Sequence, residues 1–330
     1  MRIAIDGMGG DNAPRVIVQG TQKAAALYPD THFEIFGDKE QISRYLNGEE
    51  NISVVHTSEV ISGEDEPVRA VRSKKDSSLV RAARSVKEGE NDALFSAGNT
   101  GALLAAGTLI VGRIRSIDRP ALMGVMPDIK GNGQQTILLD LGANAESKAK
   151  SLNQYGTIGS YFAKTLTHAK NPTVALLNNG TESTKGTEVT QEAYRLLSEN
   201  ENIHFVGNIE AREVLSQSVN VIVADGFTGN AVLKTIEGTA LTMISLLKSA
   251  IQGSGVKGKL GGLLLKDGLK DMKKKLDYTE LGGAILVGVK APVMKTHGAT
   301  DVRAVVRTLE QMREILQDNV VGKLVDVFSK

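Results

Sequence analysis

The sequence predicts an α/β fold in which a doubly wound, mostly parallel sheet carries helices on both faces. Two observations support this fold class. Short apolar runs rich in β-branched residues alternate with segments of helical periodicity, which is the order of βαβ units. Several of these runs also end in a glycine-rich turn that leads directly into a helical pattern, as residues 219–224 do before Gly226. Runs that are apolar throughout are typical of strands buried on both faces.

The predicted elements alternate along the chain. Strands are expected at 3–6, 33–36, 52–56, 92–97, 121–126, 137–140, 174–177, 219–224, 282–289 and 293–295. Helices are expected at 16–27, 41–46, 153–166 and 231–237, and a terminal helix is expected after residue 299 with Asp301 at its first turn. We interpret residues 1–330 as a single α/β domain, from which a helical hairpin at 241–276 protrudes.

Composition and charge exclude several classes of protein. The 330 residues carry a formal net charge of +1, so we expect no general binding of nucleic acid or other polyanions. The absence of cysteine excludes disulfides, thiolate metal sites and a cysteine nucleophile, and it fits a reducing cytosol. The first residues are typical of a strand and not of a signal peptide, and no apolar segment approaches the ~20 residues of a membrane span.

Two turns share the pattern Gly-x-Thr-Gly and are the strongest candidates for a ligand site. They lie at 98–101 and 226–229, each between a predicted strand and a predicted helix. The start of a helix has unpaired amide groups and the positive end of the helix dipole, which together bind anions such as phosphate. Ordinary turn glycines are the alternative interpretation, and for a single turn of this kind it is the stronger one.

Two further strand ends, at 7–12 and 141–144, resemble these turns. In an open α/β sheet such turns emerge at the carboxyl ends of the strands, where ligands bind. We therefore expect several turns to share one site for phosphate and substrate. Its candidate residues are Gly98, Asn99, Thr100, Gly101, Asn144, Asp225, Gly226, Thr228 and Gly229.

Several familiar motifs are missing or incomplete. The run at 180–186 lacks the glycine before Lys185 that a P-loop requires. Lys185 still follows a predicted strand and could reach a phosphate, although a solvated surface lysine would need no such role. Asn12 replaces the third glycine of a dinucleotide fingerprint, Gly-x-Ser-x-Gly is absent, and the five histidines lack metal-ligand spacing. We therefore expect neither a cofactor nor a metal.

The segment 64–87 is rich in charge, with an excess of basic residues. A solvated helix face is the simpler interpretation, and contact with an acidic partner near the turn at Gly98 is the alternative. Arg113 and Arg115 follow in a connection between elements. The sequence leaves open whether either arginine contacts a ligand.

The segment 241–276 differs from the rest of the chain. One amphipathic helix begins it, a break follows at 253–255, and a second helix has one apolar face formed by Leu265, Leu269, Met272 and Leu276. Residues 256–276 contain seven lysines and two aspartates, a net charge of +5. Such a helix can lie on an anionic membrane, dock an acidic protein, or pack on its own protein or a second subunit. The candidates for membrane contact are Leu260, Leu263, Leu264, Leu265, Lys266 and Leu269.

Four stretches, at 3–14, 96–102, 140–144 and 225–230, resemble in this order the motifs of the bacterial fatty acyl-acyl carrier protein:phosphate acyltransferase family. The resemblance covers essentially the whole chain. One departure is Gly7, where the family often has alanine. The resemblance implies a fold like that of the isocitrate dehydrogenase and phosphotransacetylase group.

The resemblance also implies an activity and its partners. The expected reaction moves a long-chain fatty acyl group from acyl carrier protein to inorganic phosphate and gives acyl phosphate for phospholipid synthesis. Lys185 and Asn230 match positions thought to be catalytic in the family. A cytoplasmic homodimer is implied, peripherally associated with the membrane, with a glycerol-3-phosphate acyltransferase acting downstream.

The residues agree with direct attack of phosphate on a thioester. A thiol with a pKa of about 8.5 leaves without strong acid help, so the protein must mainly supply proximity, charge and oxyanion stabilisation. A phosphotransacetylase acting on acetyl-coenzyme A would need the same turns but no membrane hairpin. A decarboxylating dehydrogenase would need a nicotinamide cofactor and a metal held by clustered aspartates, which we do not find. A non-enzymatic membrane scaffold would leave the glycine turns unexplained.

Overall fold

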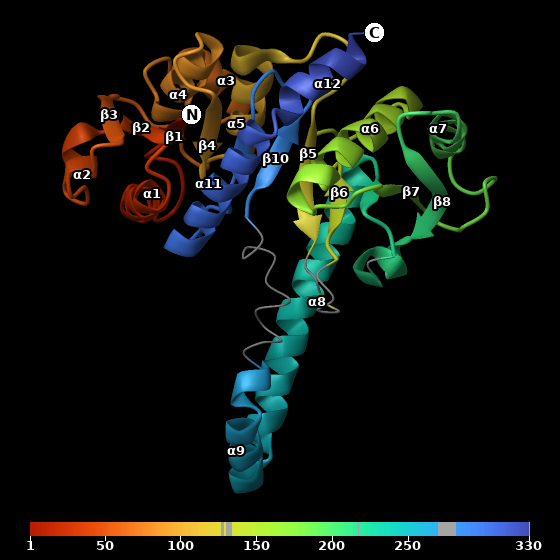
Figure 1. The fold of residues 1–330 in the computed structure, drawn as a ribbon. Coiled ribbons are helices and arrows are strands. Elements are labelled where there is room, and N and C mark those ends of the chain that lie inside the picture. Colours follow the sequence, from red (N-terminus) through yellow and green to blue (C-terminus); the bar gives the residue numbers. More distant parts are fainter. Residues whose placement is uncertain (127–128, 130–133, 217, 270–281, 330) are drawn as a thin grey trace.

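The computed structural model of the chain describes residues 1–126, 129, 134–216, 218–269 and 282–329. These residues form one sheet of eleven strands in the order β3-β2-β1-β4-β11-β10-β5-β6-β9-β7-β8 (Figure 1). The strands are β1 (Arg2–Asp6), β2 (His32–Gly37), β3 (Ile52–His56), β4 (Ala93–Ser96), β5 (Ala121–Met126), β6 (Thr136–Leu139), β7 (Thr173–Asn178), β8 (His204–Glu210), β9 (Val221–Val223), β10 (Ala284–Val287) and β11 (Val293–Lys295). Ten of them coincide with or overlap the predicted strands, and β8 was not predicted.

Helices cover both faces of the sheet. They are α1 (Arg15–Leu27), α2 (Lys39–Ser43), α3 (Pro67–Ser73), α4 (Ser78–Lys87), α5 (Thr100–Ala106), α6 (Ala149–Leu166), α7 (Glu188–Ser198), α8 (Gly226–Gly253), α9 (Gly255–Leu264), α11 (Val302–Gln317) and α12 (Val320–Phe328). Short turns of other helix types are η1 (Gly107–Gly112) and η2 (Ala211–Ser216). Asp301 caps α11 as predicted, because its carboxylate accepts a hydrogen bond from the amide of Ala304 at 2.9 Å.

Successive side chains along a strand point to opposite faces of the sheet and so belong to different apolar clusters. Ile3 and Ile5 pack on the side of α1, α6, α11 and α12, whereas Ala4 packs on the side of α3, α4 and α5. In the other half of the sheet, Leu138 and Ile222 pack near the first turns of α8. The predicted run of strands buried on both faces is therefore confirmed.

The sheet consists of two halves whose strands run in opposite directions. β1 is parallel to β2 and β4, and β4 is parallel to β11, while β6, β9, β7 and β8 are parallel to one another. β10 is antiparallel to both β11 and β5, and β5 is antiparallel to β6. The carboxyl ends of β4 and β9 consequently point in opposite directions along the strand axis. Our expectation that all the glycine turns emerge on the same side of the sheet, at the carboxyl ends of its strands, was wrong, because it assumed a single strand direction.

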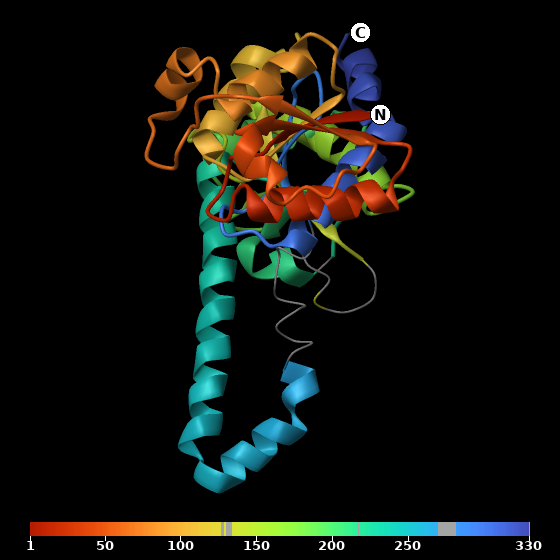
Figure 2. The same cartoon turned by 90° about the vertical axis from the view of Figure 1, so that its left-hand side faces the viewer.

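A long arm projects from the body of the molecule (Figures 1 and 2). Its main element is α8, whose 28 residues correspond to a length of about 42 Å. The predicted break is present, since α8 ends at Gly253 and α9 begins at Gly255. The apolar stretch from Leu260 to Leu264, which follows the break, is helical and belongs to α9.

Two glycines allow α9 to fold back onto the end of α8. A β-carbon at Gly258 would lie 2.1 Å from the carbonyl oxygen of Ile251, and one at Gly262 would lie 2.6 Å from the side chain of Ile251. Met272, Leu276 and the lysines at 270 and 273–275 lie outside the described residues, as do the side chains of Lys257 and Lys259. Where the chain is described, no helix combines the length and the apolar character that crossing a bilayer requires.

Candidate active site

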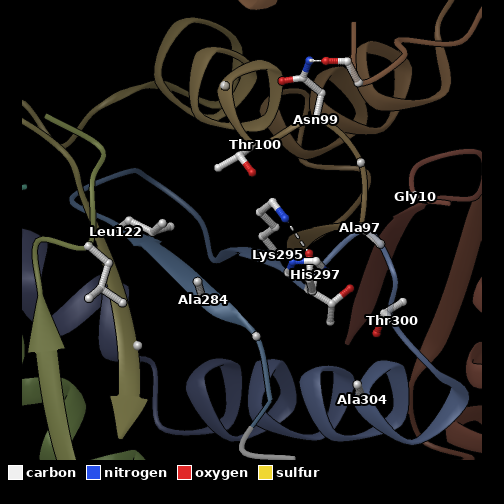
Figure 3. A pocket seen from close by; sticks show the side chains of 18 of the residues that line it. Gly10, Ala97, Asn99, Thr100, Leu122, Ala284, Lys295, His297, Thr300 and Ala304 are labelled. Carbon is white, nitrogen blue, oxygen red and sulfur yellow. Dashed lines mark hydrogen bonds between the residues drawn. The ribbon is translucent and has the colours of Figure 1, made fainter. Parts of the chain in front are cut away.

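A cavity of about 860 Å³ lies over the middle of the sheet. The turn between β4 and α5 forms one wall, and β5 and the first turns of α8 form the opposite wall. The ends of β10 and β11 and the segment 60–63 complete it. Figure 3 shows Lys295 rising from β11 into this space, with the side chain of Thr100 pointing toward it from the opposite side. Elements from both halves of the sheet thus line one cavity, which lies on a face of the sheet and not at the carboxyl ends of parallel strands.

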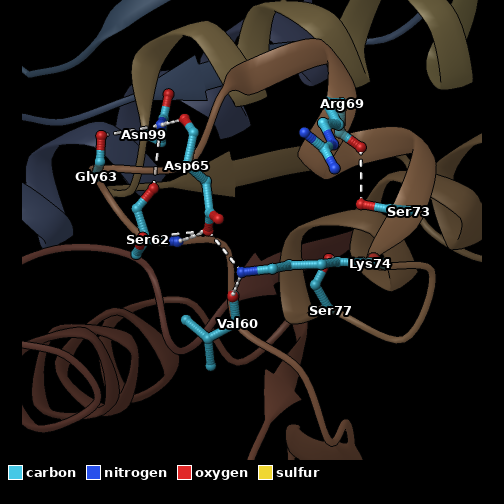
Figure 4. Close-up of polar contacts among 9 residues, drawn as sticks. All are labelled: Val60, Ser62, Gly63, Asp65, Arg69, Ser73, Lys74, Ser77 and Asn99. Atoms are coloured by element: carbon cyan, nitrogen blue, oxygen red, sulfur yellow. Dashed lines mark hydrogen bonds and ion pairs between the residues drawn. The ribbon is translucent and has the colours of Figure 1, made fainter.

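Asn99 organises the wall that contains the Gly-x-Thr-Gly turn. Its side-chain oxygen accepts a hydrogen bond from the amide of Ala102 at 3.0 Å and so caps α5. Its amide nitrogen donates to the main-chain carbonyls of Ser62, Gly63 and Asp65 at 3.1, 3.3 and 3.2 Å (Figure 4). Asn99 therefore holds two stretches of the cavity wall together, a role that its position in a glycine turn did not reveal.

The same wall rests on a buried carboxylate. Asp6, at the end of β1, accepts hydrogen bonds from the hydroxyls of Ser78 at 2.5 Å and Ser96 at 2.7 Å. Burial raises the pKa of Asp6, and the hydrogen bonds to Ser78 and Ser96 act in the opposite direction. The Ser96 hydroxyl in turn accepts from the amide of Gly98 at 3.0 Å. The end of β1 thus fixes where the turn at Gly98 begins.

Lysines supply the positive charge of the cavity. Nζ of Lys295 donates to the carbonyl oxygen of Thr296 at 2.7 Å. Burial, and then repulsion by Lys234, lower the pKa of Lys295 to about 8, while Asp11 acts in the opposite direction. Nζ of Lys234 lies 2.7 Å from a carboxylate oxygen of Glu237. The sequence predicts 293–295 only as a strand, because a single lysine at the end of a strand is no local signal of a site.

The opposite wall of the cavity is apolar. Leu122 of β5 faces it, together with Leu141 and, from α8, Leu233. Asn230 also lines the cavity, close to Gly142. The cavity therefore joins a cationic end to an apolar side, and a charged reactant and a hydrocarbon chain both find matching surroundings.

The structure brings together some of the predicted site residues and separates others. Residues 98–101 and Asn230 line the cavity, and Gly142 joins them. Five predicted binding residues are not among its lining: Asn144, Asp225, Gly226, Thr228 and Gly229. Arg113 and Arg115 are exposed outside the lining too, and the guanidinium of Arg113 donates to the carbonyl oxygen of Asp118 at 2.8 Å.

Residues 226–229 are the first turn of α8 and not a loop before it. The Asp225 carboxylate caps this turn, accepting from the amide and the hydroxyl of Thr228 at 2.9 and 2.6 Å. A β-carbon at Gly226 would lie 2.1 Å from the carbonyl oxygen of Asn144. Close packing of α8 on the segment 140–144 thus explains why Gly226 is a glycine, and phosphate binding by this turn stays a prediction.

Asn144 is engaged in holding the same segment. Its amide nitrogen donates to the Pro120 carbonyl at 2.7 Å, to the Asp140 carboxylate at 2.8 Å and to the Tyr155 hydroxyl at 3.2 Å. The Asp140 carboxylate also accepts from the main-chain amides of residues 122 and 142–144. Burial raises the pKa of Asp140 and outweighs these hydrogen bonds.

Lys185 lies in the exposed loop between β7 and α7, outside the lining of the cavity. Its main-chain amide donates to Glu182 at 3.1 Å, and its carbonyl accepts from the side chain of Asn178 at 3.1 Å. The loop thus has a defined backbone, but its contact with phosphate stays a prediction.

Comparisons of the whole sequence identify close relatives. A family model described as "Fatty acid synthesis protein" matches residues 1–323. A phosphate acyltransferase of Streptococcus uberis is 54% identical over 329 residues, covering 100% of this chain and 98% of the relative. A phosphate acyltransferase of Enterococcus faecalis is 53% identical over 328 residues, covering 99% of this chain and 98% of the relative.

Solved structures share the fold at much lower identity. A phosphotransacetylase from Streptococcus pyogenes aligns with a TM-score of 0.60 and 14% identity, covering 96% of this chain and 94% of that one. A branched-chain phosphotransacylase from Enterococcus faecalis aligns with a TM-score of 0.57 and 14% identity, covering 96% and 99%. These likenesses confirm the predicted fold class.

Proposed function

The chain belongs to the fatty acid synthesis protein family, and from this membership we propose that it is a phosphate acyltransferase that moves a long-chain acyl group from acyl carrier protein to inorganic phosphate. The reaction forms one bond and breaks another. A phosphate oxygen attacks the thioester carbonyl carbon, the carbon–sulfur bond breaks, and the carrier-protein thiolate leaves and takes up a proton. The products are acyl phosphate and free carrier-protein thiol.

The observation that carries the proposal is the cavity with a cationic end and an apolar wall. Phosphate is a dianion near neutral pH and needs positive charge to approach a carbonyl group. Lys295 supplies that charge at the end of β11. Leu122, Leu141 and Leu233 present the apolar surface that a fatty acyl chain requires. The same cavity can therefore hold both inorganic phosphate and the fatty acyl chain.

Asn230 and Lys185 are the proposed catalytic residues. Asn230 lines the cavity beside Gly142, where its side-chain amide is suited to donate a hydrogen bond to the reacting carbonyl oxygen. Lys185 is proposed to pair with phosphate from its exposed loop after β7. The amides of residues 98–101 and 226–229 are proposed to stabilise phosphate or the oxyanion.

The arm is proposed to serve two contacts. Leucines along α8 are exposed, Leu241 by 70% and Leu246 by 65%, so the helix suits a homodimer in which a second copy covers them. At the far end, Leu263 and Leu264 are exposed by 67% and 79% and lie beside the exposed Lys266. Apolar side chains next to a lysine suit the headgroup region of an anionic membrane, and Leu260, Leu265 and Leu269 extend the same surface.

A cytoplasmic enzyme that meets the membrane at this arm would release a lipid-soluble product where it is used. Acyl phosphate is hydrolysed in water, and delivery at the bilayer to a glycerol-3-phosphate acyltransferase would protect it. The folds of the solved phosphotransacetylases leave acetyl-coenzyme A as the second candidate donor. The apolar wall and the exposed arm favour the long-chain donor.

A comparison of donors tests the proposal. Phosphate-dependent release of free thiol is measured with a long-chain acyl carrier protein and with acetyl-coenzyme A at equal concentration. We expect the specificity constant for the long-chain donor to exceed that for acetyl-coenzyme A by at least about 100-fold, since each buried methylene contributes about 0.8 kcal/mol. Equal or reversed specificity would favour the phosphotransacetylase.

A further inference from the structure

Lys295 occupies the centre of the sheet, an unusual place for a lysine. It ends β11 and pairs with Ser96 of β4 on one side and Ala284 of β10 on the other. Both neighbours are small, so the space above the strand stays open. Because side chains alternate along a strand, Lys295 lies on the same face as Val293 and opposite to the buried Met294. Its side chain therefore points into the cavity and not into the other core.

No carboxylate of the described residues forms an ion pair with the ammonium group of Lys295, although the charge of Asp11 acts on it from farther away. The described residues give its Nζ one hydrogen bond, to the carbonyl of Thr296, and no ion pair. Lysine has three donors, so two are left for another acceptor. Burying a charge without a partner costs several kcal/mol. A partly buried cation without an ion pair is therefore a candidate for binding an anionic ligand.

A second cation faces the same space from α8. Lys234 is close enough to repel Lys295, and this repulsion adds to burial in lowering the pKa of Lys295. Lys234 is already paired with Glu237 and is 57% exposed at its side chain. Lys295 is thus the lysine of the cavity lining that has no ion pair among the described residues. Perturbed cations in a cavity are typical of functional sites.

We propose that Lys295, with Lys234 beside it, forms the binding site for the attacking phosphate. This inference rests on the proposed acyl transfer and assigns its phosphate site to the end of β11. A phosphate there also lies within the space faced by the Thr100 hydroxyl, which points toward Lys295 (Figure 3). The ammonium group offsets the charge of the dianion as its oxygen approaches the thioester, and it stays charged throughout, so no proton leaves it.

Phosphate binding without any acyl donor is the first test. Thermal unfolding is measured at increasing inorganic phosphate, with sulfate-free buffer and constant ionic strength, for the wild type, Lys295→Met and Lys290→Met. Lys290 is an exposed lysine just before β11, and its replacement by methionine removes the same charge outside the cavity. We expect phosphate to raise the Tm of the wild type and of K290M, and the apparent Kd in K295M to be weaker by about 10- to 100-fold. Equal Kd values in K295M and wild type would overturn the proposal.

The pH dependence gives a second test that does not rely on removing the side chain. The titratable groups lining the cavity around Lys295 are Lys234, Glu237, Asp11 and His297. All of them are also present in Lys295→Arg, whose guanidinium stays charged at high pH. Phosphate affinity of the wild type should fall as pH rises through about 8, the pKa of Lys295, whereas that of K295R should change much less between about pH 7.5 and about pH 9.5. Parallel profiles for both proteins would contradict the assignment.

Steady-state kinetics can show which of two phosphate groups Lys295 binds. The acyl donor carries a phosphodiester on its pantetheine arm, and inorganic phosphate is the second substrate. If Lys295 binds the attacking phosphate, K295M raises the KM for inorganic phosphate and leaves the KM for the acyl donor nearly unchanged. A change confined to the KM of the donor would overturn the proposal. If the wild type binds phosphate through Lys295 but releases no thiol, the proposed acyl transfer fails and the anion site remains.

Discussion

Gly229 lies directly against Asp140, so closely that a β-carbon on the glycine would sit 2.0 Å from the Asp140 carbonyl oxygen. The first turn of α8 can therefore pack on the end of β6 only if this position has no side chain. The same packing sets the direction in which α8 leaves the sheet, and it brings Asn230, the next residue, to the cavity. A glycine that looked like a phosphate ligand in the sequence thus positions a proposed catalytic residue.

Replacing Gly229 with alanine should destabilise the protein by at least about 1–3 kcal/mol, because the clash is with main-chain atoms that cannot rotate away. The matched control is Gly238→Ala, farther along α8, where a β-carbon meets nothing within 4 Å. Alanine there should stabilise the helix by up to about 1 kcal/mol. Urea unfolding measures both variants, and equal stability of the two would contradict the packing argument.

Asn99→Asp should loosen the wall of the cavity while keeping the cap of α5. Aspartate still accepts from the amide of Ala102, but its oxygen would face the carbonyls of Ser62, Gly63 and Asp65 without a hydrogen to donate. We expect a loss of about 1–3 kcal/mol in the free energy of unfolding and faster hydrogen exchange at residues 60–65. Asn47→Asp adds the same charge at an exposed position and should leave both quantities unchanged. Unaltered exchange in N99D would refute this role.

Asp76 should give the protein an acid-sensitive contact beside that wall. Its carboxylate accepts from the hydroxyl and amide of Ser58, and these bonds, with a further one from Arg81, lower its pKa to about 2. A lowered folded-state pKa means that Asp76 stabilises the fold above its unfolded pKa of about 4, and that this contribution is lost as pH falls toward 2. The stability difference between wild type and Asp76→Asn should therefore be larger at pH 7 than at about pH 3. A stability difference between the two proteins that is larger at about pH 3 than at about pH 7 would contradict this role of Asp76.

The sequence could predict most elements but not how the two halves of the sheet meet. The strands 52–56, 121–126 and 293–295 have the predicted bounds, because their apolar β-branched runs are local signals. β8 escaped prediction because Gly207 and Asn208 interrupt its pattern. The antiparallel contact between β5 and β6 joins segments whose pairing no local pattern encodes. That contact decides which turns share the cavity.

The candidate site was predictable only in part for the same reason. The turn at 98–101 and Asn230 were recognised by their glycine and amide patterns, and both line the cavity. Lys295 was missed because one lysine at the end of a strand looks like any strand end until its neighbours in the sheet are known. Asn144 was included because its motif lies beside a strand, although its side chain is used to hold its own segment.

Lys185→Ala should lower turnover by at least about 100-fold without changing the unfolding transition, since the proposed pairing with phosphate stabilises the transition state and the side chain is exposed. Lys170→Ala removes an exposed lysine from another loop of the same half and should retain activity. Wild-type turnover in K185A would remove Lys185 from the mechanism.

Replacing Leu263, Leu264 and Leu265 together with glutamine should abolish sedimentation with anionic vesicles, because these side chains provide the exposed apolar surface at the end of the arm. Acyl transfer from a soluble donor to phosphate should be spared, since none of the three lines the cavity. Leu27→Gln changes a leucine that is 60% exposed on the body and should leave vesicle binding intact. Unchanged sedimentation of the triple variant would show that the arm does not carry membrane binding.

Acyl transfer to phosphate yields two products, free thiol and acyl phosphate, and both can be measured in one reaction. Purified protein is incubated with a long-chain acyl carrier protein, with and without inorganic phosphate. Free thiol is measured first, and acyl phosphate is then trapped by hydroxylamine after the unreacted acyl carrier protein has been removed. We expect thiol to appear only with phosphate and in equal amount to the trapped acyl group. Thiol release that is independent of phosphate, or release without trapped acyl phosphate, would contradict it.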